Sequence, residues 1–428
     1  MGLKKSISVR KGVILAVSMV IGSGLFGLPG LTLEKGSVYE VIAGWGVTVV
    51  AVIPLIYIFA KLGSSYPSAA GIAKYAQESF GERGRYAATY ILIGTFIIGL
   101  PGIAIIGGEC ISRVTGGSGE AVYIYALLIL IAATVQNLLP HKWSIVINSG
   151  AVFILALILA GVILLNRDNI ADGMALLGGV NSGNISVKNL WSVSALIFWA
   201  FLGWENLSFG LEEFKNPEKN IPKVYLGSFL IVTVFYLLLA FATVGAKSNG
   251  LEIAGASGIT VLFHGTFFAK WIIIAMIAVI VANCGSWAFG ASRLLFSAGR
   301  EGIVWRKTGE TDKNGIPFCS LAILFLIYIA VLYLSYFYKI GVDILMMLVN
   351  QNFIILYIMT VAAYYKVESR AVKNLIIGAA VFSMLFFISG FTYMMVYPVV
   401  LGIAGITVFN RYISKNRAVQ PAEKNQEK

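Results

Sequence analysis

The sequence is poor in charged residues. Only 12% of its 428 residues are Asp, Glu, Lys or Arg, whereas 58% are hydrophobic. Because soluble domains carry about 25% charged residues, this balance excludes an ordinary soluble globular protein. Repeated apolar runs of about twenty residues, each long enough to cross a bilayer, indicate instead an all-α protein that spans the membrane many times.

Residue types that carry metal, disulfide or catalytic chemistry are also scarce. Cys110, Cys284 and Cys319 are too widely spaced to predict a disulfide framework or a metal site. The two histidines, His141 and His264, are too few and too far apart for a zinc cluster. We therefore expect no metal, no cofactor and no enzyme activity, because no catalytic set of side chains falls within the apolar runs.

The apolar runs predict twelve membrane-spanning helices. Their approximate ranges are 11–33, 38–60, 86–112, 120–139, 143–165, 190–211, 223–246, 268–298, 317–338, 341–365, 372–389 and 392–410. A glycine-rich break is predicted at 22–26 in the first helix, and a second break is predicted near 201–205 (FLGWE) in the sixth helix. An odd number of spans between the two breaks makes the halves antiparallel, which is the inverted-repeat arrangement of secondary transporters.

Lysine and arginine are distributed unevenly between the loops. If the N-terminus is inside, seven of the 32 Lys and Arg residues lie outside and the other 25 lie on the cytoplasmic side. The seven are Lys35, Arg113, Arg167, Lys188, Lys247, Lys270 and Lys339. This asymmetry predicts a multi-pass protein of the cell membrane with both termini in the cytoplasm. The net charge of +12 then faces anionic lipids, and no nucleic-acid partner is expected.

These features divide the chain into five parts. Their predicted bounds are 1–10 for a cytoplasmic N-terminus, 11–166 for a first repeat of five spans, 190–366 for a second repeat, 367–410 for two further helices, and 411–428 for a disordered cytoplasmic tail. The loops that follow spans two and seven are both near twenty residues and could each hold a short surface helix. In the first of these loops, Ile72, Tyr75, Ala76 and Phe80 form an apolar stripe at helical spacing.

The first break is the stretch GSGLFG at 22–27. Glycine costs about 1 kcal/mol relative to alanine inside a helix, and unwound backbone in a membrane is tolerated only where it lines a protected cavity. Free amides of Ser23, Gly24 and Leu25 at the start of a half-helix favour an anion such as a substrate carboxylate. The alternative is a glycine patch for helix packing. A dinucleotide site is rejected because no strand precedes the motif.

Glu205 and two tryptophans mark a second candidate region. An ionised carboxylate in a span is costly, which makes Glu205 a functional hypothesis, although a permanently protonated or paired structural glutamate is the alternative. Trp199 lies just before the second break, and Trp287 lies in the middle of the eighth span. Their aromatic faces suit an amino-acid side chain or an ammonium group, and ordinary helix packing is the alternative for both.

Several segments together resemble the amino acid–polyamine–organocation superfamily. They are IGSGLFGLPG (21–30), FWAFLGWENLSFGLEEFKNPEKNIPKV (198–224) and GASRLLFSAGREGIV (290–304). With YPSAAGIAKYAQESFG (66–81) and IGLPGIA (98–104), the chain is most similar to the branch that exports methionine and branched-chain amino acids. The resemblance covers nearly the whole chain.

The resemblance implies a LeuT-like core of five plus five inverted spans with broken helices one and six, followed by two extra helices. It also implies a binding site. The implied substrate-binding residues are Ile21, Gly22, Ser23, Gly24 and Leu25 in the first span, Trp199, Leu202 and Gly203 in the sixth, and Trp287 in the eighth. Glu205 matches a glutamate linked to proton coupling. Some relatives carry a titrating lysine in span five, where this chain has INSG at 147–150, so Glu205 remains the candidate.

The sequence therefore predicts a secondary active transporter that moves neutral apolar amino acids by alternating access. A proton gradient is the expected driving force, and export follows from the family branch. An importer or exchanger of cationic amino acids or polyamines is the alternative, because Glu205 could pair with a cation. A channel is disfavoured because it would need a repeated ring of polar residues. The expected partners are a small amino-acid substrate and the lipid bilayer, with a monomer and a homodimer both open.

Overall fold

The structure is a computed structural model of the chain. It describes residues 7–67, 71–117, 119–139, 141–181, 183–208, 210–211, 214–255, 258–263, 265, 267, 269–312, 315–369, 371–389 and 393–423. Within these ranges nearly every residue is helical, and the extended backbone pairing is a single bridge between Ile7 and Phe214. The predicted all-α class is confirmed.

Fifteen α-helices follow one another along the described chain. They are α1 (Val9–Val20), α2 (Ser23–Lys35), α3 (Val38–Ser65), α4 (Ile72–Thr115), α5 (Gly119–Leu138), α6 (His141–Leu165), α7 (Arg167–Ala175), α8 (Val187–Ile197), α9 (Trp204–Ser208), α10 (Pro217–Ser248), α11 (Ala269–Arg300), α12 (Phe318–Phe337), α13 (Val342–Val367), α14 (Lys373–Ser389) and α15 (Val396–Glu423). Short 3₁₀ segments are η1 (Leu176–Gly179), η2 (Phe198–Phe201), η4 (Gly258–Phe263), η5 (Arg306–Gly309) and η6 (Tyr393–Met395).

Ten helical segments of the described chain are long and apolar enough to cross a membrane, with α1 and α2 counted together. The two other predicted spans correspond to the interrupted segment α8–η2–α9 and to α14, which is shorter. The protein is therefore a multi-pass membrane protein with the predicted set of helices. Whether its halves are related by inverted symmetry is not tested by these bounds and stays a prediction.

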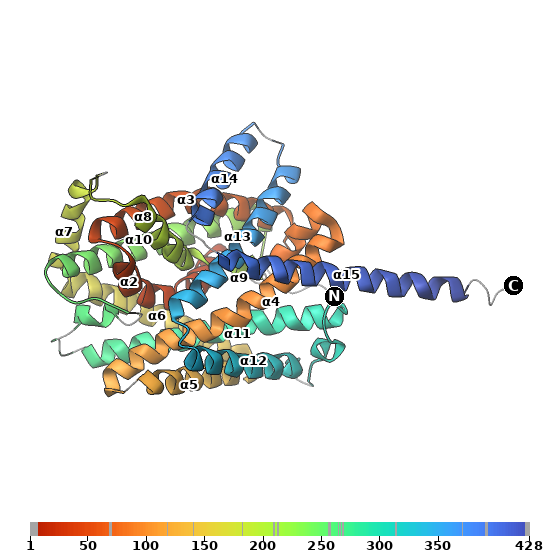
Figure 1. Ribbon diagram of the computed structural model, residues 1–428, viewed down its shortest axis with the longest axis horizontal. Coiled ribbons are helices and arrows are strands. Elements are labelled where there is room, and N and C mark those ends of the chain that lie inside the picture. The colour runs from red at the N-terminus through yellow and green to blue at the C-terminus, as the bar shows by residue number, and fades with distance from the viewer. Residues whose placement is uncertain are drawn as a thin grey trace.

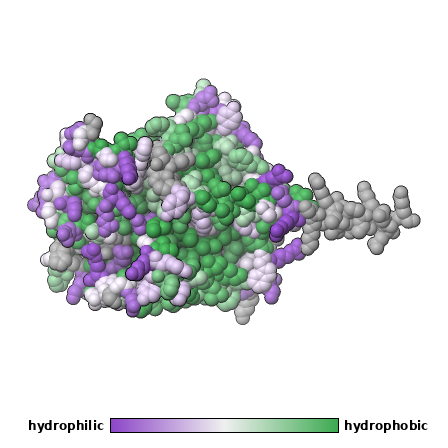
Figure 2. Space-filling model, in the orientation of Figure 1, coloured by the Kyte–Doolittle hydropathy of each residue, from purple (hydrophilic) through white to green (hydrophobic). Residues whose placement is uncertain are grey.

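The long helices run side by side along one axis of the molecule, and both termini lie at the same end of the bundle (Figure 1). Hydrophobic residues dominate the middle of the surface, while hydrophilic residues gather towards the ends (Figure 2). Large apolar side chains such as Phe153, Leu226 and Leu326 are more than half exposed on α6, α10 and α12. An exposed apolar surface of this extent is expected where lipid covers the protein.

The surface helix predicted after span two is present. The stretch 72–80 opens α4 and is separated from the membrane-spanning part by a bend at Gly81, where φ is +66°. Ile72, Tyr75 and Ala76 of the predicted stripe are fully buried, and Phe80, its fourth residue, is 51% exposed. Phe80 lies beside the Gly81 bend, which turns the chain before a further apolar position can pack.

Two segments differ from the predicted elements. The connection between residues 165 and 190 contains α7 and η1, which the search for apolar runs missed because α7 (RDNIADGMA) is polar. α15 continues as a helix to Glu423, so an unstructured tail does not begin at residue 411. Lys, Arg, Ala, Gln and Glu are frequent in this extension, and these residues favour helix even without an apolar face.

Candidate functional site

The first membrane-spanning segment is interrupted where the glycines predict. α1 ends at Val20, Ile21 is extended (φ −81°, ψ 111°), and α2 starts again at Ser23 after Gly22 (φ −153°, ψ −131°). The Ile21 amide still donates to the Val17 carbonyl at 2.8 Å. Ser23 and Gly24 open α2, so their backbone amides have no carbonyl acceptor within the helix. The side chain of Ser23 lies outside the described part of the structure.

Gly22 lies directly against Asn283 of α11. A Cβ atom added at Gly22 would be 2.2 Å from both the Cγ and the Oδ1 of Asn283, so any other residue would displace that amide. Asn283 is itself buried. The start of α2 thus faces a polar side chain from a helix that is distant in the sequence. The sequence pattern predicts that Asn283 lies in a membrane span, but it does not predict the contact with Gly22.

The two breaks pack against each other through Gly24 and Trp199. A Cβ atom at Gly24 would be 3.0 Å from Trp199 Cδ1 and 3.3 Å from the Cα atom of Ala200 in η2. The Trp199 and Trp287 rings are stacked with centroids 6.2 Å apart and an angle of 14°, and the Phe96 ring meets Trp287 edge-on. The structure therefore brings together Gly22, Gly24, Trp199 and Trp287 from three separate segments.

The second break follows the same principle but is more tightly constrained. η2 ends at Phe201, Leu202 is extended (ψ 152°), and Gly203 has a φ of +122°, which side chains rarely tolerate. A Cβ atom at Gly203 would also lie 2.7 Å from the carbonyl oxygen of Met19 in α1. Gly203 therefore lets the second break approach the end of α1 closely.

Glu205 is completely buried in the first turn of α9. Its Oε1 accepts a hydrogen bond from the Gly203 amide at 2.7 Å, and its Oε2 accepts one from the Tyr357 hydroxyl of α13 at 3.0 Å. Glu205 therefore caps the half-helix and ties the break to α13. The sequence analysis missed Tyr357, because nothing in the pattern of α13 distinguishes this residue from a packing tyrosine.

A small cavity lies beside the first break. Ser18, Ile21, Asn148 and Asn283 are among its lining residues, and it has room for about one water molecule. Asn148 belongs to the stretch INSG at 147–150, and it accepts a hydrogen bond from the Ser286 hydroxyl at 3.0 Å. An amino acid would enter this region only if the surrounding helices moved apart.

Of the other residues in the predicted site, Leu25 and Leu202 are buried beside the two breaks. The Leu25 amide donates to the Gly22 carbonyl at 3.1 Å, so it is already engaged and is not a free donor. The roles of the assembled residues in substrate binding stay predictions.

The sequence profile of the amino acid permease family matches residues 7–413. The chain is 27% identical over 425 residues to the uncharacterized amino acid permease YecA of Bacillus subtilis, covering 94% of this chain and 95% of that protein. It is 28% identical to the putrescine transporter PotE of Haemophilus influenzae, covering 69% of each. It is 24% identical to the L-methionine/branched-chain amino acid exporter YjeH of Escherichia coli, covering 60% of each.

The family match extends over all the predicted spans, and the helical breaks fall inside it. The relatives are transporters, so the expectation of a non-enzymatic protein is confirmed. The chain belongs to the amino acid permease family of the amino acid–polyamine–organocation superfamily.

Proposed function

We propose that the protein transports neutral, apolar amino acids such as methionine and the branched-chain amino acids by alternating access. Transport is coupled to protons through Glu205 and runs outward under physiological gradients. The observation that carries this proposal is the pairing of a helix start whose first amides lack an intrahelical acceptor with an apolar and aromatic wall, in which the described residues offer no uncommitted carboxylate.

The substrate carboxylate is assigned to the start of α2. The free amides there and the partial positive charge of a helix N-terminus favour an anion. The Asn283 side chain at Gly22 supplies a further polar contact next to these amides. Because the surroundings are buried, each hydrogen bond to a carboxylate is stronger than it would be in water.

The side-chain preference follows from the wall of the site. Ile21, Trp199, Trp287 and Phe96 are all buried and present apolar or aromatic surface. Glu205 is the acidic group beside the second break, and both of its oxygens accept hydrogen bonds already. A cationic substrate would have to break one of these bonds, whereas a leucine or methionine side chain would not. An apolar wall separates close homologues by only about 1–3 kcal/mol per methylene, so several substrates are expected.

Glu205 is suited to coupling because its carboxylate connects the second break to α13. A protonated carboxyl group accepts fewer hydrogen bonds, so proton binding weakens the link of α9 either to the Gly203 amide or to Tyr357 of α13. A proton that favours one arrangement of the broken helix over another shifts the population between them. This is the minimum that proton coupling requires.

Transport of cationic amino acids or polyamines is the second candidate. The relative PotE is a putrescine transporter, and Glu205 is a buried carboxylate within the region of the site. If Glu205 exchanged the Tyr357 hydroxyl for a substrate ammonium group, a polyamine could be held between Glu205 and the aromatic rings.

A panel of labelled substrates in proteoliposomes tests both candidates. Leucine, methionine, arginine and putrescine are each measured with and without an imposed proton gradient, for uptake and for efflux. Saturable leucine or methionine transport that responds to the gradient supports the proposal. Transport confined to arginine or putrescine would establish the second candidate, and gradient-independent leucine exchange would remove the proton-coupling part.

A further inference from the structure

Arg293 is a charged residue in α11 for which no ionic partner is found among the residues that the structure describes. Its guanidinium group lies over the Phe289 ring, 4.4 Å from the centroid. Its Nη1 atom is buried and has no hydrogen-bond partner among the described residues. The residue as a whole is only partly buried, but a buried guanidinium nitrogen without a hydrogen-bond partner is costly, so an arginine in such a position within a span is a functional hypothesis.

Arg293 lies on a defined face of its helix. Residues that are separated by alternating steps of three and four lie on one side of an α-helix. On α11 this side holds Asn283, Ser286, Gly290, Arg293 and Ser297, which we call the α11 face. The face starts at the first break, because Asn283 contacts Gly22.

The α11 face is turned towards the broken helices and α6. Ser286 donates a hydrogen bond to Asn148 of α6, as described above. A Cβ atom at Gly290 would lie 3.5 Å from the Oδ1 atom of Asn206 in α9. Arg293 follows Gly290 by one turn, about 15 Å along the helix from Asn283. It therefore lies between the candidate site and the end of the bundle.

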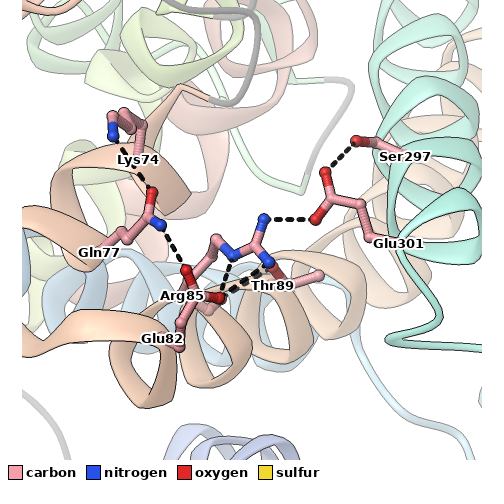
Figure 3. A network of polar contacts seen from close by, with 7 residues as sticks. All are labelled: Lys74, Gln77, Glu82, Arg85, Thr89, Ser297 and Glu301. Atoms are coloured by element: carbon pink, nitrogen blue, oxygen red, sulfur yellow. Dashed lines mark hydrogen bonds and ion pairs between the residues drawn. The ribbon is translucent and has the colours of Figure 1, made fainter. Parts of the chain in front are cut away.

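The far end of the α11 face reaches a network of paired charges (Figure 3). Ser297 donates to Glu301 at 3.3 Å, and Glu301 pairs with Arg85, which also pairs with Glu82. This network lies at the end of the bundle where both termini lie, the predicted cytoplasmic side (Figure 1). Arg85 thus forms two ion pairs, whereas Arg293, one turn before Ser297 on α11, forms none with the residues that the structure describes.

Asn206 supplies a complementary unpaired group. Its Oδ1 atom is buried and has no hydrogen-bond partner within the described ranges. Asn206 Oδ1 lies beside Gly290, and Arg293 follows Gly290 by one turn on the same face of α11, so a donor and an acceptor that lack partners among the described residues are neighbours along this face. An α-amino acid carries both matching groups, a carboxylate for the guanidinium and an ammonium for the amide oxygen.

We propose that Arg293 and Asn206 form a second amino-acid binding site, between the candidate site and the predicted cytoplasmic face. Arg293 binds the substrate carboxylate after it leaves the start of α2 or before it arrives there, and Asn206 binds the substrate ammonium group. The site opens when the α11 face separates from α9. This inference rests on the proposed function and adds to it an intermediate position on the route of the substrate.

Arg293→Gln tests this site, and Arg300→Gln is the matched control. Arg300 lies on the same helix with its guanidinium over the aromatic ring four residues earlier, Phe296, but it is exposed. Labelled leucine transport is measured in inside-out and right-side-out vesicles, so that the KM at each face is obtained separately. We expect Arg293→Gln to raise the KM at the termini-bearing face about tenfold, as the loss of a charged hydrogen bond would. The KM at the other face, and both values in Arg300→Gln, should stay within about twofold of wild type.

Several results would overturn the inference. Arg293→Gln could leave both KM values unchanged, or raise them equally, which would make the residue a structural cation. Its effect could also disappear when anionic phosphatidylglycerol is omitted from the vesicles, which would assign the guanidinium to lipid phosphate. If Arg293→Gln does not fold, Arg293→Lys and Asn206→Ala replace it, with a face-selective rise again expected. Wild-type vesicles that do not transport leucine at all would instead contradict the proposed function.

Discussion

The two helix breaks are built from the same material but are held in different ways. Each is unwound at a glycine that touches the other segment or a neighbouring helix, Gly22 in the first and Gly203 in the second. At the first break, the first backbone amides of α2 have no acceptor within the helix, and no side chain of the described residues caps them. At the second break, the Glu205 carboxylate already caps the half-helix.

This difference separates binding from switching. The uncapped start of α2 retains donors for an external anion. The start of α9 has satisfied its first donor internally, and its connection to α13 depends on a group that can gain a proton. The first break is therefore suited to hold the substrate, and the second is suited to respond to the driving ion.

Gly203→Ala should have the largest effect, and this effect should be on stability. The added Cβ atom meets the Met19 backbone at 2.7 Å, and the φ of +122° is strained for alanine, at a cost of about 3 kcal/mol. We expect a lower melting temperature and less monodisperse protein in detergent. Gly46→Ala is the control, since a Cβ atom there has no neighbour within 4 Å. Equal stability of the two variants would show that the second break relaxes freely.

Gly22→Ala should affect binding more than stability. Its Cβ atom meets the end of the Asn283 side chain, which must then move away from Gly22 and so change the polar surroundings assigned to the substrate carboxylate. We expect leucine binding to weaken about 100-fold, as the loss of one to two charged hydrogen bonds would. Scintillation-proximity binding and thermal unfolding measured on the same preparation check this. Unchanged affinity would place the carboxylate away from the first break.

The contrast between these glycines shows what the sequence can predict. Both breaks are predicted at the correct place, and for the first the signal is local, because a glycine cluster inside an apolar run needs no knowledge of neighbours. The number of spans is equally local, since it depends on the length of each apolar run. Trp199 and Trp287 are also recognisable as candidates, because each lies near a break or in the middle of a span.

The partners of these residues are not predictable in this way. Asn283 contacts Gly22 across 261 positions of the chain, and Tyr357 reaches Glu205 across 152. Which side of α11 or α13 faces the breaks depends on how the helices pack. The sequence does not show this side, because a helix that is apolar all round has no polar face to mark its orientation. The polar helix α7 was missed for the opposite reason, since it has no apolar run at all.

Glu205→Gln should change the pH dependence of transport while leaving the fold intact. The amide keeps an oxygen acceptor for the Gly203 amide but cannot gain or lose a proton. We expect leucine transport to lose its response to an imposed pH gradient, measured between about pH 5 and 8 in proteoliposomes. Glu40→Gln is a matched control, because Glu40 is also buried but caps α3 together with Ser37. A pH profile of Glu205→Gln that matches wild type would move coupling to another group.

The smallest effects should come from the two tyrosines that serve the breaks. Tyr357 donates to the Glu205 carboxylate, whereas Tyr236 donates to the Val20 carbonyl at the end of α1, at 3.2 Å. Removing either hydroxyl should cost about 1 kcal/mol of stability, because each leaves a buried acceptor with one bond fewer. Only Tyr357→Phe should also displace the pH profile, since only its acceptor can bind a proton. Because burial and size are nearly unchanged in both variants, equal pH profiles would show that the link between Glu205 and α13 is structural and would remove the distinction between the two breaks.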